Sequence, residues 1–357
     1  MNTPKAKILC TFLPSSPLKL THFILQEWKQ RKIIYDEHFT RVILLEHIQS
    51  KQLCALKLYL KKRMTERELQ RKQKDFAREI KVHYLMDGIP HILPLYFWFE
   101  TKTVWGLITK YMNHSYLLHH IYNFSNERHI IHQVIYPLLK AIHSLHSQHI
   151  IHRDIKPENI FIHHSDVFLG DFGYSYILSK EESCCTSLAG TITYMAPELL
   201  YHYIDASHPL KYSYEIDIWS LGVIVYEMLF HIKPFGWSTY KNFSKEDPSK
   251  PTFILKRLNT SLLFSESVSI SEEAIDFLQK CLDKKPSHRP TSSELLEHPW
   301  ILNYLKGMIE DTSLRKCPSE DLIVNPKSHS HPPQLPVKLP QKKLLKKSFW
   351  KNLCIMC

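Results

Sequence analysis

Alternating apolar and polar residues predict β-strands in the first third of the chain. Three such runs, RKIIY, RVILLEHI and LCALKLYL, lie between residues 30 and 60 and are rich in β-branched side chains. The segment SKQ between the last two runs suits a hairpin turn. A second pair of runs, ILPLYFWF and TVWGLITKY, follows after residue 91. The pattern therefore predicts a small antiparallel sheet.

Apolar residues at helical spacing predict helices between and after these strands. Thr65 and Glu68 have the spacing of a capping box and open a charged helix with one apolar face, which should pack on the sheet. Residues 131–145 carry a longer apolar face, although Pro137 within it should kink or weaken the helix. Residues 215–230 are apolar on nearly every side, which predicts a helix buried at the centre of a large core.

The order of these elements predicts an α+β protein with two lobes, a small antiparallel sheet followed by a mainly helical lobe. The Pro- and Ser-rich segment near the C-terminus lacks the apolar bulk for a packed core. The predicted divisions are an N-terminal extension (1–29), a small lobe with its hinge (30–112), a large lobe (113–302), a Pro/Ser-rich linker (303–341) and a basic tail (342–357).

Composition favours a folded intracellular protein. The chain has 357 residues, of which 44% are hydrophobic, so it is long enough for one large core or two modest ones. Its eight cysteines are scattered, with no even ladder of spacings and no paired metal-ligand doublets, which favours a reducing compartment. The apolar run at residues 8–13 is too short for the core of a signal peptide. The most apolar stretch, residues 216–232, contains Asp217 and Glu227, which a lipid-exposed helix would hardly tolerate.

The formal net charge of +11 is concentrated between Lys57 and Lys81 and in the last sixteen residues, and it predicts anionic partners. Nucleic acid is not expected among them, because the sequence has no paired zinc-finger ligands and no RNA-recognition signature. The 23 histidines include pairs three residues apart, which makes a metal site an alternative. No HExxH accompanies these pairs and a zinc site needs three or four convergent ligands, so compositional bias is the favoured explanation.

Three motifs in a fixed order carry the chemistry. Residues 151–161 read IHRDIKPENIF, DFG begins 17 residues after Asp154 at Asp171, and APE follows 25 residues later at residues 196–198. Together they resemble the protein kinase superfamily, and the resemblance covers about residues 34–300. It implies the two-lobed protein kinase fold and transfer of the γ-phosphoryl group of Mg-ATP to a hydroxyl of a protein substrate.

The resemblance assigns a role to each polar residue of these motifs. Asp154 should orient the substrate hydroxyl and accept its proton as the catalytic base. Lys156 should place a positive charge on the transferring oxygens, and a lysine at this position resembles the Ser/Thr branch, which implies Ser or Thr acceptors. Asn159 and Asp171 supply hard oxygen ligands suited to Mg²⁺, the expected metal cofactor.

The resemblance also assigns the ATP site. Lys57 in CALK resembles the strand lysine that grips the α and β phosphates, and Glu79 in AREI resembles its partner on the next helix. The alternative is a pair of surface charges on basic elements. Thr109 in LITKYM resembles the gatekeeper beside adenine, or else is a strand threonine of no special role. The implied ATP-contacting residues are Ile34, Val42, Ala55, Lys57, Glu79, Lys110, Met112 and Phe161.

The glycine-rich loop of the family should occupy residues 34–42, but Tyr35, Glu37 and Thr40 stand where the three glycines belong. Side chains forbid some of the backbone conformations that glycine allows there, and Glu37 adds negative charge near the phosphates. A raised Michaelis constant for ATP is therefore expected, with the chemical step retained. The alternatives are a pseudokinase scaffold with weakened ATP binding and, less favoured, a small-molecule kinase of similar fold.

Arg153 beside the base resembles the arginine on which a phosphorylated activation loop docks, which implies regulation by an upstream activating kinase. Counting back from APE places the phosphosite at Ser187, with Thr186 as the alternative. Thr191 resembles the residue that bonds the catalytic aspartate and lysine, and it should stay unmodified.

Other charged residues of the large lobe resemble structural or specificity positions. Glu198 with Arg289 should form a buried ion pair, and Asp217 should anchor the catalytic loop. Glu158 and Glu227 match positions that recognise basic residues upstream of the acceptor in some relatives, although many kinases carry these acids for packing.

The C-terminal sequence KKLLKKSFWKNLCIMC combines a C-a-a-X pattern at Cys354 with five nearby lysines. A prenyl group on Cys354 together with the basic residues would hold the chain on an anionic membrane, which predicts a cytoplasmic protein peripheral to a membrane. A calmodulin-type basic helix and a solvated tail are the two alternatives.

Overall fold

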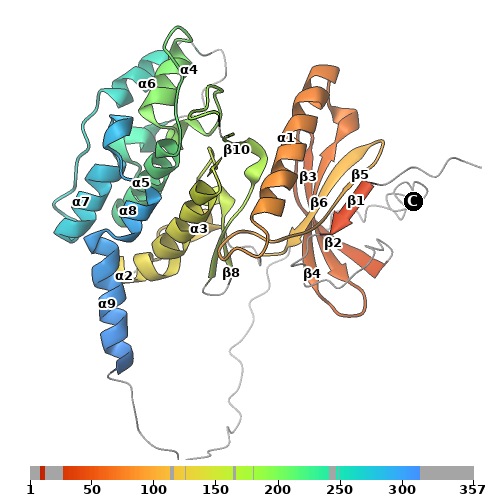
Figure 1. The fold of residues 1–357 in the computed structure, drawn as a ribbon, viewed down its shortest axis with the longest axis horizontal. Coiled ribbons are helices and arrows are strands. Elements are labelled where there is room, and N and C mark those ends of the chain that lie inside the picture. Colours follow the sequence, from red (N-terminus) through yellow and green to blue (C-terminus); the bar gives the residue numbers. More distant parts are fainter. Residues whose placement is uncertain are drawn as a thin grey trace, which may run out of the picture.

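The structure is a computed structural model that describes residues 9–12, 27–112, 116–124, 126–163, 166–179, 181–240, 247 and 249–313. The described residues form two lobes that lie side by side (Figure 1). The predicted basic tail with Cys354, nearly all of the Pro/Ser-rich linker and most of the N-terminal extension lie outside the described residues. The domain boundaries and the lipid attachment at Cys354 therefore stay predictions.

The small lobe is built on one antiparallel sheet, which confirms the strands that the alternating pattern predicted. Its strand order is β1-β5-β6-β4-β3-β2. The edge strand β1 comes from the N-terminal extension and was not predicted. The strands are β1 (Leu9–Phe12), β2 (Trp28–Glu37), β3 (Thr40–His47), β4 (Leu53–Leu60), β5 (Leu95–Glu100) and β6 (Val104–Lys110).

One helix, α1 (Glu66–Leu85), packs on this sheet (Figure 1). Its N-terminus has the predicted capping box, in which the Thr65 hydroxyl accepts the backbone N–H of Glu68 and the Glu68 carboxylate accepts the backbone N–H of Thr65. On its buried face the ring of Phe76 stacks on Trp105 of β6, with ring centroids 5.8 Å apart. This packing fixes the helix against the sheet and so fixes the position of Glu79.

The large lobe is mainly helical and contains two short antiparallel sheets of two strands each. In one, β7 (Ile150–Ile151) pairs with β10 (Tyr176–Ile177), and in the other, β8 (Ile160–His163) pairs with β9 (Asp166–Leu169). No helix among the described residues combines the length and the apolarity needed to cross a bilayer. The helices are α2 (Glu127–Ile130), α3 (Tyr136–Ser147), α4 (Pro197–Ile204), α5 (Glu215–Phe230), α6 (Lys250–Leu258), α7 (Glu272–Cys281), α8 (Ser292–Leu296) and α9 (Pro299–Ser313).

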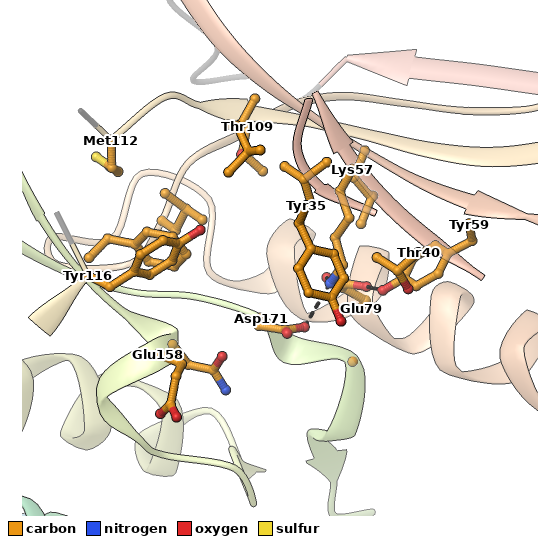
Figure 2. A pocket seen from close by; sticks show the side chains of 18 of the residues that line it. Tyr35, Thr40, Lys57, Tyr59, Glu79, Thr109, Met112, Tyr116, Glu158 and Asp171 are labelled. Carbon is orange, nitrogen blue, oxygen red and sulfur yellow. Dashed lines mark hydrogen bonds and ion pairs between the residues drawn. The ribbon is translucent and has the colours of Figure 1, made fainter. Parts of the chain in front are cut away.

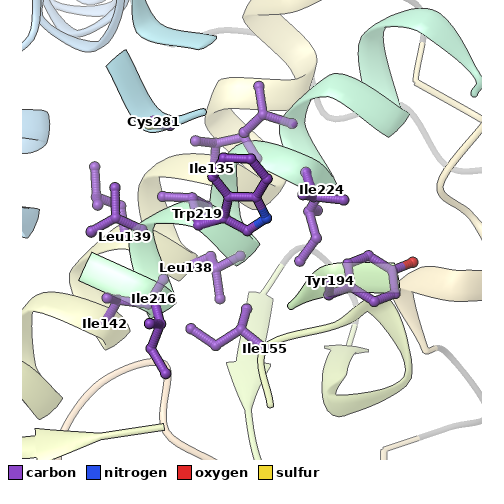
Figure 3. Packing of buried hydrophobic residues seen from close by; sticks show 14 of the residues in the cluster. Ile135, Leu138, Leu139, Ile142, Ile155, Tyr194, Ile216, Trp219, Ile224 and Cys281 are labelled. Atoms are coloured by element: carbon purple, nitrogen blue, oxygen red, sulfur yellow. The ribbon is translucent and has the colours of Figure 1, made fainter. Parts of the chain in front are cut away.

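Helix α5 is the predicted buried helix, because every one of its residues after Glu215 is buried. Figure 3 shows part of the surrounding core, where Trp219 of α5 lies in one apolar cluster with Leu138 of α3 and Ile155. Gly222 permits the close approach of α7, since a Cβ at this position would lie 2.7 Å from the Cβ of Cys281.

The helical run that contains Pro137 is continuous over residues 127–147 but not regular, because a π-helical turn lies directly before the proline. Helix α2 is followed by a π-helical turn, Ile131–Ile135, and α3 starts at Tyr136. Pro137 is the second residue of α3, directly after the turn in which the π-helical pattern replaces the regular i→i−4 hydrogen bonds that a proline interrupts.

Two predicted structural contacts of the large lobe are confirmed. Glu198 and Arg289 form a two-bond ion pair with N···O distances of 2.7 and 2.8 Å, and the Arg289 side chain has no exposed surface. Asp217 of α5 accepts the backbone N–H groups of His152 and Arg153 at 2.8 and 2.9 Å. The helix at the centre of the core thus holds the catalytic loop directly.

Candidate active site

A cavity of about 420 Å³ opens between the two lobes and is the site to which the sequence pointed. Strands of the small sheet form its upper wall, and the segments after β7 and β9 form its floor (Figure 2). All of the predicted ATP-contacting and metal-binding residues line it, namely Ile34, Val42, Ala55, Lys57, Glu79, Lys110, Met112, Asn159, Phe161 and Asp171.

Lys57 of β4 is the centre of the charge network in this cavity. Its ammonium group lies 3.0 Å from Glu79 Oε1 on α1 and 2.8 Å from Asp171 Oδ1 in the DFG segment (Figure 2). The three residues are far apart in the sequence and come from a strand, a helix and a loop. The predicted pair of Lys57 and Glu79 is therefore assembled, and the alternative of two separate surface charges is wrong.

The protonation states in this network follow from burial and charge. Burial alone would lower the pKa of Lys57, but the carboxylates of Asp171 and Glu79 outweigh it and raise the pKa well above its usual range. Burial disfavours the ionised form of Asp171, yet the neighbouring Lys57 ammonium lowers the pKa of Asp171 to about 2. Burial raises the pKa of Glu79, and Lys57 only partly offsets it. Asp171 is therefore the more firmly ionised of the two acids.

Tyr59 belongs to the same network and was missed at the sequence level. Its hydroxyl donates to Glu79 Oε2 at 2.9 Å and so fixes the second oxygen of the carboxylate. The signal was present in the strand pattern, because residues two apart on β4 point to the same face and Tyr59 follows Lys57 at this spacing.

Asp154, the predicted base, lies in a hydrogen-bonded cluster on the catalytic loop. Lys156 Nζ lies 2.8 Å from its Oδ2, and Asn159 Nδ2 donates to the same oxygen at 3.2 Å. The Thr191 hydroxyl donates to Asp154 Oδ1 at 2.7 Å and accepts from Lys156 Nζ at 2.9 Å. Burial would lower the pKa of Lys156, but the Asp154 carboxylate raises it, so the lysine stays charged. Thr191 thus makes both of the contacts that the sequence implied for it.

The loop that carries the base has an unusual backbone at Arg153, whose φ is +70° in the left-handed region. The two hydrogen bonds that the backbone N–H groups of His152 and Arg153 donate to Asp217 hold this conformation. His152 ties the loop to the DFG segment, because its Nε2 lies 3.1 Å from the carbonyl oxygen of Gly170. Asp171 follows with φ of +60°, so the base and the DFG aspartate lie on two strained segments that are tied to each other.

The Arg153 side chain reaches the activation segment. Its Nη1 donates to the Ser187 hydroxyl at 2.8 Å and to the Ser187 carbonyl oxygen at 3.1 Å. The same nitrogen also donates to the Tyr212 hydroxyl at 3.0 Å. Of the two candidate phosphosites, both of which are exposed, the serine is the one with a described contact to Arg153; Thr186 has none among the described residues.

The segment in place of the glycine-rich loop is a closed β-hairpin. Strands β2 and β3 pair up to the partners Glu37 and Thr40, and the turn residue His38 has φ of +48°. Asp36 ties the hairpin down, because Arg41 Nε and Arg63 Nη1 donate to its carboxylate at 2.9 and 2.7 Å. Ion pairs therefore stabilise a turn that the family builds with glycines.

Tyr35 on this hairpin lines the cavity and extends its ring from the upper wall towards Asp171 (Figure 2). Its hydroxyl donates to Glu37 Oε2 at 3.1 Å. Burial and the neighbouring Glu37 carboxylate raise the pKa of Tyr35, so the phenol is neutral near pH 7. The neutral ring of Tyr35 and the carboxylate of Glu37 thus lie above the cavity at the positions where the family has glycines.

The hinge side of the cavity is formed by Thr109, Lys110 and Met112. The backbone N–H of Lys110 donates to the carbonyl oxygen of Pro94 at 3.1 Å, so it is already engaged within the small lobe. On the floor, Tyr116 packs on Phe161 with ring centroids 5.0 Å apart, and both rings line the cavity. Nothing in the sequence pattern indicated Tyr116, because it precedes a single 3₁₀ turn, Leu117–His119, that is too short to show a periodic pattern.

These donors fit a magnesium nucleotide. Asp171 is ionised and, with the amide of Asn159, offers oxygen ligands of the kind that Mg²⁺ prefers. Lys57 supplies a permanent positive charge beside them for phosphate oxygens. The apolar residues Ile34, Val42 and Phe161 line the same cavity and suit a flat heterocycle.

The sequence of residues 29–301 matches the family model described as the protein kinase domain. With the motifs and the two-lobed fold, this match places the chain in the protein kinase family, in its serine/threonine branch. The predicted family, fold class and enzyme class are thereby confirmed. The comparisons give no support to the pseudokinase alternative.

The relatives it resembles are kinases from fungi and animals. An Aurora kinase of Debaryomyces hansenii is 34% identical over 309 residues, which cover 83% of this chain and 66% of that protein. An Aurora kinase of Saccharomyces cerevisiae is 29% identical over 291 residues, covering 80% of this chain and 71% of that protein. Serine/threonine-protein kinase 17A of Oryctolagus cuniculus is 30% identical over 249 residues, covering 68% and 58%. The chain thus spans about six to seven tenths of the length of these relatives.

Proposed function

We propose that this chain catalyses Mg-ATP-dependent phosphorylation of serine and threonine side chains in proteins. The observation that carries the proposal is the position of Lys57, whose ammonium group bonds Glu79 on α1 and Asp171 in the DFG segment at the same time. This arrangement joins the two lobes across the cavity. It requires α1 to be packed inward and the DFG segment to face the cavity, as phosphoryl transfer demands.

The chain's own residues divide the reaction between them. Mg-ATP supplies the γ-phosphoryl group when bound. Asn159 and Asp171 would hold the metal, and Lys57 would neutralise phosphate oxygens. Asp154 Oδ orients the substrate hydroxyl and takes its proton as the new oxygen–phosphorus bond forms and the bond to the β-phosphate breaks. Lys156 stabilises the negative charge on the transferring oxygens.

Phosphorylation of Ser187 by an upstream kinase is proposed as the activating step. Its hydroxyl already lies 2.8 Å from Arg153 Nη1, so a phosphate there would meet a guanidinium group without rearrangement of the arginine. Arg153 adjoins Asp154 in the chain, which connects the modified loop to the base. Thr186 lacks this contact among the described residues and is the weaker candidate.

The test is incorporation of radiolabelled phosphate from ATP into a protein substrate by the purified chain. The wild type should show magnesium-dependent incorporation, and Asp171→Asn should lower it by about a hundredfold or more, since a metal ligand is worth several kcal/mol. Asp166→Asn, which changes an exposed aspartate of β9, is the matched control and should retain activity. Equal rates for Asp171→Asn and wild type would refute the proposal.

A further inference from the structure

Glu227 is a carboxylate of the buried helix α5 that is only 3% exposed and has every oxygen engaged. Its Oε1 lies 2.5 Å from Lys233 Nζ and accepts from the Tyr122 hydroxyl at 3.4 Å. Its Oε2 accepts from the Tyr194 hydroxyl at 2.9 Å. The donors come from three separate segments, so the acid is the centre of a built polar site on the surface of the large lobe.

This site lies next to the catalytic base. Tyr194 ends the short helical turn Ile192–Tyr194 that begins directly after Thr191, and Thr191 donates to Asp154. Burial raises the pKa of Tyr194, and the charges of Glu227 and Glu158 raise it further, which places Glu158 near the same corner. A polypeptide that presents a hydroxyl to Asp154 must therefore pass close to Glu227.

Lys233 is held in this site from several directions. Its ammonium group lies 5.0 Å above the centre of the Tyr194 ring, in addition to the ion pair with Glu227. Pro234 follows it and favours an extended backbone, and Lys233 has φ of −77° and ψ of 145°. Its backbone N–H also donates to Ser238 Oγ at 2.7 Å. The backbone around Lys233 is thus constrained, and this holds its side chain at the Glu227 carboxylate.

We propose that Lys233 is a specificity-determining residue that fills the Glu227 subsite with a cation of the chain itself. A basic substrate side chain that approached Glu227 would meet a like charge, and it would have to displace an ammonium group that is largely buried. The substrate class at this subsite is therefore peptides with a neutral or acidic side chain. This inference rests on the proposed kinase function, and it specifies which substrates that function takes.

The experiment is a positional scan of serine peptides in which each of the five residues upstream of the acceptor is in turn Ala, Arg or Glu. Wild type should show no preference for Arg over Ala that depends on Glu227. Lys233→Met should gain an Arg preference of about tenfold at a single position, the value of one charge-assisted hydrogen bond. Lys233→Met combined with Glu227→Gln should lose this gain. Lys280→Met, which removes the exposed ammonium partner of Asp276, is the matched control.

Three outcomes overturn the inference. The first is a folded Lys233→Met variant, checked by its melting temperature, that shows no new Arg preference. The second is a wild-type preference for Arg that is lost in the single variant Glu227→Gln, because Glu227 would then bind the substrate cation although Lys233 is present. This measurement does not depend on how well Lys233→Met folds. The third is that wild type incorporates no phosphate into any peptide of the scan. This result refutes the proposed kinase function itself, and it differs from equal incorporation into all peptides, which leaves that function standing.

Discussion

Replacing Asp217 by alanine should both destabilise the large lobe and abolish turnover. The carboxylate is 1% exposed and accepts the backbone N–H groups of His152 and Arg153, with His146 Nε2 3.0 Å away. Alanine leaves two buried N–H donors without a partner, at about 1–3 kcal/mol each, so the free energy of unfolding should fall by about 2–6 kcal/mol. That is a large share of the roughly 5–15 kcal/mol that stabilises a typical domain.

The measurement is urea unfolding of wild type, Asp217→Ala and Asp217→Asn, with kcat determined on the same preparations. Asp217→Asn keeps one acceptor oxygen and should lose about half as much stability as the alanine variant. The control is Asp205→Ala, because Asp205 is exposed and bonds the backbone N–H of Ser207 at a loop. A loss below about 1 kcal/mol in Asp217→Ala would refute the idea that α5 holds the loop through this carboxylate.

The same residue predicts a pH dependence. Burial opposes ionisation of Asp217, but the hydrogen bonds from His146 and the backbone of His152 outweigh it and hold its pKa below the usual range. A lowered folded-state pKa stabilises the protein above the unfolded value of about 3.9, and this stabilisation is lost as the pH falls through the folded pKa. Wild type should therefore lose stability relative to Asp217→Asn as the pH is lowered below about 4.

Three further predictions concern the nucleotide and the loop. The triple variant Tyr35→Gly, Glu37→Gly, Thr40→Gly should lower the KM for ATP with kcat retained, because it removes the Tyr35 ring and the Glu37 carboxylate from above the phosphate region. ATP saturation curves with an unchanged KM would contradict this. Thr109→Phe should weaken inhibition by bulky purine analogues at least about tenfold, and equal inhibition constants would defeat the gatekeeper assignment. Ser187→Ala should prevent activation by an upstream kinase. Phosphosite mapping, with activity measured before and after treatment with that kinase, will check this. Full activation of the alanine variant would assign the phosphosite elsewhere.

Site residues that belong to a sequence motif were predicted well. Residues that reach the site only through the folding of the chain were not. Lys57 and Asp171 were both assigned to the ATP site because their motifs recur at fixed positions in a family, although 114 residues separate them; their direct contact was not predicted. Tyr59 was accessible through strand alternation but needed the position of α1 to reveal its partner. Lys233 could not be assigned, since nothing in the sequence indicates that its ammonium group pairs with Glu227, six residues earlier. The π-helical turn before Pro137 was likewise not predicted, because the apolar pattern of residues 131–145 was read as one regular helix.

The position of Arg153 links the interior of the large lobe to its surface. Its amide is fixed by Asp217 and its guanidinium group holds Ser187, so one residue belongs to the core and to the activation segment at once. Binding equilibria that share a residue are reciprocal. A tighter contact between Arg153 and Ser187 should therefore slow hydrogen exchange at the amides of His152 and Arg153. Loss of the Asp217 anchor should speed the removal of a phosphate from Ser187 by phosphatases.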